Sequence, residues 1–338
     1  MSLQKYIHNQ PFSLESGAIL PKVEIAYHTY GELNAAGDNV IWVCHALTAN
    51  SDVADWWSGL FGEGKPFDPS KYFIVCANIL GSCYGSSGPL TENPETGKPY
   101  FSSFPMITIR DMVKAHQLLQ THLSIKQIQL GMGGSMGGYQ LMEWAFLDKS
   151  VFKNLCLLVT SAKTSAWEIA IHEVQRLAIE ADATWKNTSP NAGANGLKAA
   201  RGMGMVTYRN YQAFKLTQED NEEKLDGFKA SSYIRYQGEK LAKRFNAQSY
   251  HLLIKAMDSH NLGRGRKSIE SALNTITANT LVIGIGSDFL CPVVEQEFIA
   301  KHIPNAQLEI ISSPFGHDGF LVEVEQISRL VELFRLSA

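Results

Sequence analysis

Short apolar runs alternate with segments of helical periodicity along the first half of the chain. Four of these runs, rich in valine, isoleucine and aromatic residues, predict β-strands at residues 23–30, 39–47, 72–80 and 152–160. The run YFIVCANIL is apolar almost throughout, which is typical of a strand buried on both faces of a sheet. Strands that alternate with helices in this way predict a mostly parallel sheet with right-handed crossovers.

The pattern changes in the middle of the chain and then returns. The remaining predicted strands are 127–134, 280–286 and 307–311, and the helices that accompany the sheet are 112–123, 137–148 and 322–336. Between about residues 161 and 268 the sequence is instead helical, polar and rich in lysine, glutamate and glutamine. We therefore predict a core domain with a mostly parallel sheet and helices on both faces, residues 1–162 and 269–338. A helical lid domain, residues 163–268, is inserted after a late strand.

The composition is that of an ordinary soluble globular protein. Hydrophobic residues make up 45% of the 338 positions and charged residues 19%, and the formal net charge is −3. Binding to a nucleic-acid backbone requires a basic surface that this balance does not predict. The densest basic cluster, Arg264, Arg266 and Lys267, fits a solvated loop.

The cysteines and the first residues predict a cytoplasmic protein. The five cysteines, an odd number at irregular spacing, are Cys44, Cys76, Cys83, Cys156 and Cys291. Three of them lie in predicted strands, which favours buried reduced thiols over a disulfide framework. The first residues contain no apolar signal-peptide core, and no apolar run reaches the roughly 18 residues that span a bilayer.

One short motif carries the main chemical signal. Residues 133–137 read Gly-Gly-Ser-Met-Gly, which fits G-x-S-x-G, and they lie between a predicted strand and a predicted helix. This is the context of a nucleophile elbow, so the motif predicts an α/β-hydrolase fold with Ser135 as the nucleophile. The alternative is a serine that only caps the helix. The spacing of Gly131, Gly133 and Met136 does not complete a dinucleotide-binding motif.

A serine hydroxyl is a weak nucleophile at neutral pH and needs a base. In this fold an acid and then a histidine follow the serine along the chain. Asp288 follows the predicted strand 280–286, and His317 lies in SSPFGHDGF after the last strand. We predict that His317 is the base and that Asp288 orients its imidazole. Asp318 is a rival acid, but as the neighbour of His317 it is better placed to face a ligand.

The other histidines have less claim to chemistry. Those on predicted helices are expected to be packed or solvated; they are His116, His122, His172, His251 and His260. His45, in the segment CHALT, is expected to shape the loop after an early strand. No H-E-x-x-H and no paired C-x-x-C is present, so no metal site is predicted.

Acyl transfer also needs donors for the oxyanion of the tetrahedral intermediate. One is the backbone N–H of the residue after the nucleophile, here Met136. The other is expected from the loop after an early strand, and Leu47 is the candidate.

Nearly the whole chain resembles a known family, the homoserine O-acyltransferases of methionine biosynthesis, chiefly the homoserine O-acetyltransferases. The resemblance is carried by HALTANSDVADWWSGLFGEGKPFD, YFIVCANILGSCYGSSGP, GGSMGGYQLMEWA, SAWEIAIHEVQRLAI, SSYIRYQGEKLAKRFNA and GHDGFL. Ser135, Asp288 and His317 match the triad of that family. The chain departs from the family at Tyr139, where methionine is commoner, and this change is expected to concern packing under the elbow helix.

The resemblance implies a ping-pong acyl transfer. Ser135 would take an acyl group from acyl-coenzyme A, most simply acetyl-coenzyme A, and pass it to the hydroxyl of L-homoserine. Arg209, in the Thr-Tyr-Arg segment, would hold the carboxylate of the amino acid and Asp318 its ammonium group. Tyr236 or Arg235 would also face the pocket.

The resemblance also implies partners. Small molecules are the only substrates expected, with no nucleic acid, no membrane and no permanently bound cofactor. In the family, lid helices form a homodimer, and residues 169–179 and 233–244 are the candidate helices here. A closed lid would protect the acyl-serine from water.

Several alternatives share the same site. An ester or thioester hydrolase would use the same triad with water as acceptor, although such an enzyme needs no pair like Arg209 and Asp318. A succinyl donor or a serine acceptor is also open, because one methylene is worth only about 1–3 kcal/mol of discrimination. A non-catalytic binding module would have no use for an intact triad.

Overall fold

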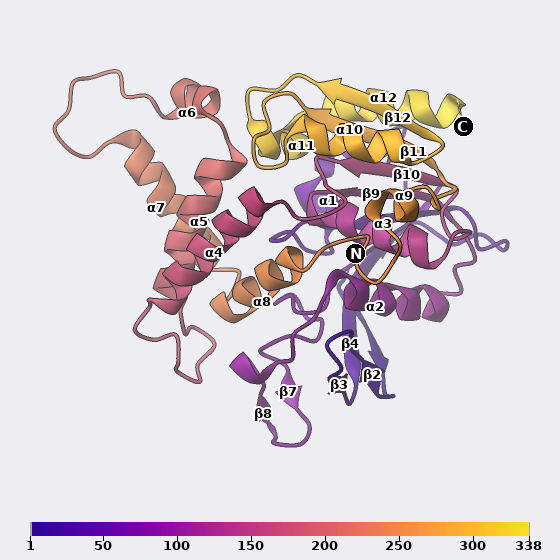
Figure 1. Ribbon diagram of the computed structural model, residues 1–338, viewed down its shortest axis with the longest axis horizontal. Helices are drawn as coiled ribbons and strands as arrows, with labels where there is room; N and C mark the ends of the chain where they lie inside the picture. Colours follow the sequence, from indigo (N-terminus) through magenta and orange to yellow (C-terminus); the bar gives the residue numbers. More distant parts are fainter. Residues whose placement is uncertain (1, 338) are drawn as a thin grey trace.

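The computed structural model describes residues 2–337 and is built around an eight-stranded sheet (Figure 1). In order across the sheet, the strands are β1 (Gln4–His8), β4 (Val23–Tyr30), β6 (Phe73–Ala77), β5 (Val40–Cys44), β9 (Ile128–Gly134), β10 (Asn154–Leu158), β11 (Asn279–Ile285) and β12 (Ala306–Ile311). Neighbouring strands from β6 to β12 are parallel, whereas β4 pairs antiparallel with both β1 and β6. The mostly parallel sheet predicted from the sequence is therefore confirmed.

All the predicted strands are present, with ends that differ by a few residues. The sequence pattern did not predict β1, which adds an antiparallel edge to the sheet. It also missed two small two-stranded ribbons, formed by β2 (Phe12–Ser13) with β3 (Ile19–Leu20) and by β7 (Glu92–Asn93) with β8 (Lys98–Pro99).

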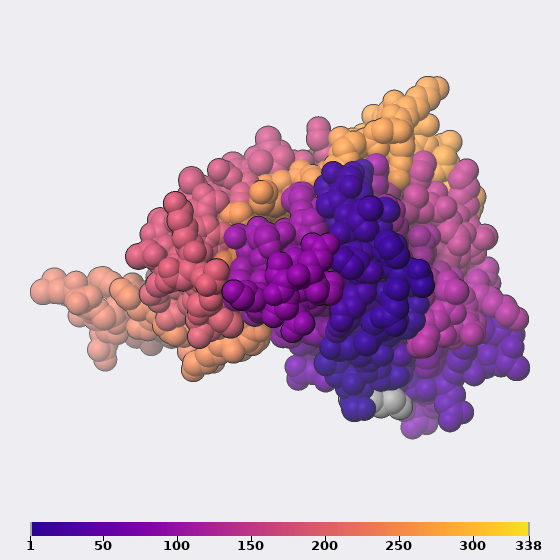
Figure 2. All heavy atoms as spheres, turned by 90° about the horizontal axis from the view of Figure 1, so that it is seen from below, coloured from indigo at the N-terminus to yellow at the C-terminus, as the bar shows by residue number. Residues whose placement is uncertain are grey.

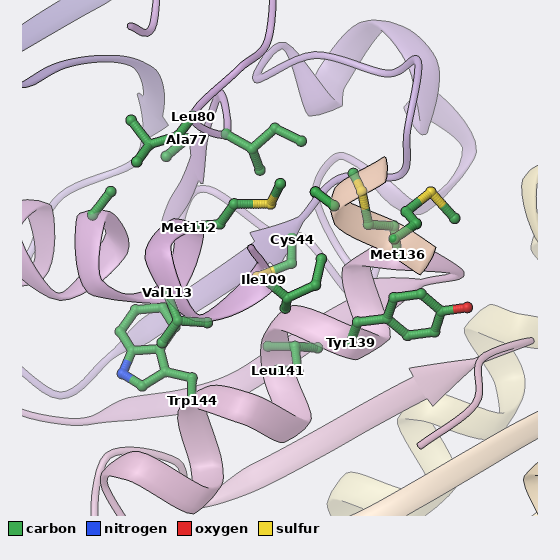
Figure 3. Packing of buried hydrophobic residues seen from close by; sticks show 14 of the residues in the cluster. Cys44, Ala77, Leu80, Ile109, Met112, Val113, Met136, Tyr139, Leu141 and Trp144 are labelled. Carbon is green, nitrogen blue, oxygen red and sulfur yellow. The ribbon is translucent and has the colours of Figure 1, made fainter. Parts of the chain in front are cut away.

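Helices cover both faces of the sheet. One layer consists of α2 (Ile109–His122), α3 (Met136–Leu147), α9 (Ile269–Leu273) and α10 (Val293–His302), and the other of α1 (Val53–Trp56), the short 3-10 helix η1 (Ser58–Leu60), α11 (Gly319–Val322) and α12 (Val324–Ser337). Along β5, Trp42 packs in the first layer and Ile41 and Val43 pack in the second. Figure 3 shows the first layer, where Val113 of α2 lies against Trp144 of α3.

Six helices lie between β10 and β11 in the chain. One is α9, which covers the sheet, and the other five form an insertion: α4 (Ala166–Glu180), α5 (Ala194–Tyr208), α6 (Tyr211–Gln218), α7 (Lys229–Ala242) and α8 (Ala247–Asp258). The five inserted helices extend to one side of the molecule (Figures 1 and 2). Among them, α5 packs between α4 and α7. Ile179 of α4 and Leu253 of α8 belong to the same hydrophobic cluster as Trp42, so this insertion is packed onto the core. These helices occupy the predicted lid, residues 163–268, but its standing as a separate domain stays a prediction.

The cysteines follow the sequence-based expectation. All five thiols are free, and Cys44, Cys76 and Cys156 are buried in strands. Within residues 2–337, none of the helices has the length and apolar character needed to cross a membrane.

Candidate active site

Ser135 lies at the sharp turn between β9 and α3. Its backbone has φ 55° and ψ −125°, a left-handed conformation that costs a non-glycine residue on the order of 1–3 kcal/mol. Hydrogen bonds hold the turn: the Ser135 N–H donates to the Leu158 carbonyl (2.9 Å), and the Ser135 carbonyl accepts from the Thr160 hydroxyl (2.8 Å). The strand–turn–helix geometry that the motif predicted is therefore present.

The glycines on either side of Ser135 let the turn approach the end of β5. A Cβ atom on Gly133 would lie 2.8 Å from the Cys44 carbonyl oxygen, and one on Gly137 would collide with the same atom. Side chains at these positions would push the elbow away from the loop that follows β5. The two glycines therefore bring Ser135 close to the loop that contains Leu47.

Two loops at the same carboxyl edge of the parallel sheet as Ser135 bring an acid and a base together. Asp288 follows β11, and His317 lies in the short helix η3 (Gly316–Asp318) after β12. His317 Nδ1 donates to Asp288 Oδ2 at 2.7 Å, while Asp288 Oδ1 accepts the N–H groups of Leu290 (2.9 Å) and Cys291 (3.0 Å). Because Nδ1 is held by the carboxylate, Nε2 is the ring nitrogen that remains for chemistry.

Burial and charge act in opposite directions on His317. Burial disfavours the imidazolium ion and would lower the pKa of His317. The negative charge and hydrogen bond of Asp288 outweigh it, with further help from Asp318 and Glu168, so the pKa of His317 is raised above the ordinary value of 6.5. An imidazole that binds a proton more strongly is a better base for a serine hydroxyl.

The predicted oxyanion donors lie on the two segments that meet at the elbow. Met136 is the first residue of α3, where backbone N–H groups have no carbonyl partner within the helix. Leu47 is in the loop after β5 and lines the same cavity as Ser135. The two N–H groups therefore come from neighbouring segments beside the serine, as a two-donor oxyanion hole requires.

A cavity of about 90 Å³ opens over Ser135. Its walls are Ala46, Leu47, Thr48, Ser135, His172, Arg201, Tyr208, Met257, Leu290, His317, Asp318, Phe320 and Leu321. The core contributes the serine and the histidine, and the inserted helices cover them from the other side. A larger groove runs along α12, but none of the triad residues lines it.

Two arginines of the inserted helices act on Asp318. Arg209 Nε lies 3.3 Å from Asp318 Oδ2, but Arg209 is not among the residues that line the cavity. Arg201, on α5, does line it. Burial raises the pKa of Asp318, and the charges of Arg201 and Arg209 only partly offset this effect. The sequence singled out Arg209 and missed Arg201, because only the packing of α5 over the core brings Arg201 to the cavity.

The structure does not bring Tyr236 or Arg235 to this cavity. Both are exposed on α7, and the side chain of Tyr236 is 59% exposed. Tyr233, on the same helix, is nearer to the site, since the Arg209 guanidinium lies 5.7 Å from its ring. Tyr236 lies about one helical turn beyond Tyr233. The sequence alone did not fix which turn of α7 approaches the site.

His172 is a cavity residue that the sequence placed among packed or solvated histidines. It lies on α4, and its Nδ1 is bonded to Asp258 Oδ1 at 2.6 Å. Arg176 binds the other oxygen of that carboxylate at 2.5 Å. The insertion thus presents a second histidine–aspartate pair to the cavity. No local motif joins α4 to α8, so only the packing of the helices reveals the pair.

Comparison with known proteins places the chain in a family. The profile of the alpha/beta hydrolase fold family matches residues 39–324. The chain is 49% identical to a homoserine O-acetyltransferase of Cyclobacterium marinum, over 99% of this chain and 96% of that protein. It is 46% identical to a homoserine O-acetyltransferase of Chlorobium luteolum, over 97% of this chain and 93% of that protein.

Solved structures agree with this placement. The homoserine O-acetyltransferase of Bacillus anthracis superposes with a TM-score of 0.92 at 25% identity, covering 99% of this chain and 97% of that one. Esterase E22 superposes with a TM-score of 0.88 at 23% identity, covering 99% and 100%, a likeness that shows the fold alone. By its sequence over almost the full length, the chain belongs to the homoserine O-acetyltransferase family of the α/β-hydrolase fold.

Proposed function

We propose that this protein transfers an acetyl group from acetyl-coenzyme A to the hydroxyl of L-homoserine. The observation that carries the proposal is the cavity over Ser135. In it the nucleophile and the base share a wall with a cation, Arg201, and an anion, Asp318. An amino acid acceptor carries one carboxylate and one ammonium group, and this pair of charges is complementary to both. Family membership supports the same acceptor.

The first half of the reaction acylates the serine. His317 Nε2 takes the proton of Ser135 as its oxygen attacks the thioester carbonyl, and Asp288 stabilises the resulting imidazolium ion. The N–H groups of Leu47 and Met136 bind the oxyanion. The tetrahedral intermediate then collapses, the carbon–sulfur bond breaks, and His317 returns the proton to the departing thiolate of coenzyme A.

The second half transfers the acyl group to the acceptor. The homoserine hydroxyl attacks the acyl-serine carbonyl while His317 removes its proton, and the proton returns to Ser135 as the ester forms. Arg201 would bind the carboxylate and Asp318 the ammonium group. Arg209 would hold Asp318 in place through its ion pair at 3.3 Å.

The size of the cavity supports a small acyl group. At about 90 Å³ the cavity is far smaller than coenzyme A, which would therefore lie outside it. We propose acyl-coenzyme A as a co-substrate and no permanently bound cofactor. Within the described part of the chain, no group of three or more potential metal-binding side chains occurs.

We further propose a cytoplasmic homodimer that associates through the inserted helices. Apolar side chains are exposed along α4, among them Trp167, Val174 and Leu177. Burial of this stripe against a second copy would also restrict the access of water to the acyl-serine.

Release of free coenzyme A thiol tests the proposed function. The purified protein would be given acetyl-coenzyme A or succinyl-coenzyme A, each with and without L-homoserine, with Ser135→Ala as the inactive control. We expect rapid thiol release with acetyl-coenzyme A that depends on homoserine. Release that is independent of homoserine would instead indicate a hydrolase, and the acceptor site proposed at Arg201 and Asp318 would have to be withdrawn.

A further inference from the structure

A buried amide connects the elbow helix to the loop after β5. Gln140 lies on α3, one turn after Met136, and its side chain is fully buried. Gln140 Nε2 donates to two carbonyl oxygens, that of Met136 (3.1 Å) and that of His45 (3.2 Å). Gln140 Oε1 lies 2.9 Å from His116 Nε2. The group thus uses both of its N–H bonds and its acceptor.

The two carbonyl groups that Gln140 binds belong to the segments that supply the oxyanion donors. Met136 is itself one donor residue, and His45 lies two positions before the other, Leu47. Because β5 ends at Cys44, the hydrogen bonds between β5 and its neighbouring strands do not hold the loop that contains His45 and Leu47. A single amide group therefore spans the two halves of the oxyanion hole.

The protonation of the neighbouring histidines fixes the direction of this amide. Burial lowers the pKa of His116 to about 4 and that of His45 to about 4, so both rings are neutral. A neutral His116 that donates from Nε2 requires the Gln140 oxygen to face it, which turns the NH₂ group towards the two carbonyls. His116 Nδ1 has no hydrogen-bond partner among the described residues, in keeping with an unprotonated nitrogen there.

The loop is held from its other side as well. His45 Nδ1 donates to the Ala46 carbonyl (2.8 Å), and His45 Nε2 accepts the N–H of Ile79 (3.3 Å). The backbone around Leu47 is therefore anchored by two neutral, buried histidines and one amide. Each of these polar groups lies in the interior, where a lost hydrogen bond would not be replaced by bulk water.

We propose that Gln140 is a positioning residue that sets the separation and direction of the Leu47 and Met136 N–H groups. An oxyanion is stabilised only if both donors lie about 2.7–3.1 Å from the place where its charge develops. Loss of the amide bridge would let the loop and the helix relax apart, which weakens binding of the transition state more than binding of the substrate. The inference rests on the acyl-serine chemistry proposed above.

A burst experiment separates this role from a merely structural one. Rapid mixing with p-nitrophenyl acetate gives the acylation rate constant and the dissociation constant of the ester, without homoserine or coenzyme A. A second probe, trifluoroacetone, adds to the serine: its carbonyl carbon bonds to Ser135, His317 takes the proton, and the ketone oxygen becomes the oxyanion. Its inhibition constant therefore reports on the oxyanion hole directly.

We expect Gln140→Met to lower the acylation rate constant by about 10- to 100-fold, somewhat less than outright loss of an oxyanion donor. The inhibition constant of trifluoroacetone should rise by a similar factor, while the dissociation constant of the ester stays unchanged. His116→Phe keeps a ring beside Trp144, with which His116 stacks at 5.7 Å, but removes the donor that orients the amide. His116→Phe should change the acylation rate constant and the inhibition constant in the same directions but by smaller factors. It provides the test if Gln140→Met does not fold.

Asn154→Leu is the matched control. Asn154 is buried at the start of β10, where its amide donates to the Gln129 carbonyl at 2.9 Å, away from the elbow at the strand's other end. It should lower thermal stability without changing either constant. If both Gln140→Met and His116→Phe keep the wild-type acylation rate constant and the wild-type inhibition constant of trifluoroacetone, the inference about Gln140 is overturned and the proposed function is unaffected. A wild-type protein without a burst would overturn it together with the proposed function, whereas a burst without transfer to homoserine would count only against the latter.

Discussion

His317 carries the proton transfer in the proposed reaction, and its surroundings determine the pH at which it works. It must be neutral to accept the proton of Ser135, and its pKa is raised above 6.5, chiefly because Asp288 outweighs the effect of burial. The acylation rate should therefore fall as the pH falls through this raised value, with an inflection above 6.5. A burst measurement across roughly pH 5 to 9 would locate it.

Asp288→Asn supplies the control for this profile. Removal of the carboxylate leaves burial as the dominant effect, so the inflection should move to lower pH, and the rate at neutral pH should fall by about 10⁴-fold because the ring loses its orientation. An unshifted inflection in this variant would assign the pH dependence to another group, such as Asp318.

The acceptor site can be divided between its two arginines. Arg201→Ala removes the guanidinium that lines the cavity, and a hydrogen bond to a charged group is worth about 1.5–3 kcal/mol. We expect the KM for homoserine to rise by about 10- to 100-fold, with the acylation half-reaction little changed. Arg209→Ala should raise the KM for homoserine by a smaller factor, because it only removes the ion pair that holds Asp318 in place. A larger rise in KM for Arg209→Ala than for Arg201→Ala would instead assign the carboxylate of homoserine to Arg209, the arginine indicated by the sequence.

At this scale the sequence predicted what depends on chain order and missed what depends on packing. Ser135, Asp288 and His317 follow from a motif and from the order of the strands, and the structure brings His317 and Asp288 into contact. Arg201 and His172 have no such signal. Each reaches the cavity only because a helix of the insertion turns one particular face towards the core.

Among the elements, α4 is joined to the elbow helix by one buried hydrogen bond. The Tyr139 hydroxyl donates to Glu168 Oε1 at 2.9 Å, and Glu168 also closes a capping box with Ser165 at the start of α4. The Tyr139 ring stacks on His260 at 4.1 Å. The expectation that Tyr139 concerns packing thus holds, but its hydroxyl adds a link to the inserted helices.

Tyr139→Phe should reveal the strength of this link. The ring stays in place, but the buried carboxylate of Glu168 loses a donor, which should lower the free energy of unfolding by about 1–3 kcal/mol in chemical denaturation. Tyr236→Phe, at an exposed position of α7, should leave it unchanged. Equal stability of the two variants would mean that solvent or another donor replaces the hydroxyl.

The strands that the sequence missed share a physical reason. Residues of β1 alternate between half-buried and exposed positions at the sheet edge, so they form no apolar run. Central strands such as β5 are buried along their whole length and are conspicuous for that reason. The short ribbons β2–β3 and β7–β8 are set by turns and by tertiary contacts, which a hydrophobic pattern does not record.

For the whole molecule, the exposed apolar stripe on α4 predicts self-association. Val174 and Leu177 are 49% and 55% exposed, so a paired Val174→Asp and Leu177→Asp variant should fold normally. In sedimentation experiments we expect a dimer for the wild-type protein and a monomer for this variant. Leu333→Asp, at an exposed position of α12, is the matched control and should remain dimeric. A wild-type monomer at micromolar concentration would refute the proposed dimer.

The position of the inserted helices has a consequence for how the protein is made. β10 ends at Leu158 and its partner β11 begins only at Asn279. During synthesis on the ribosome, β10 therefore has no partner on that side for a time on the order of ten seconds, until β11 has been made. Asp288 and His317 are synthesised later still. In the proposed mechanism, Ser135 would have no base until the last part of the chain emerges. The nascent protein would therefore not consume a thioester before the helices proposed to shield its acyl form are in place.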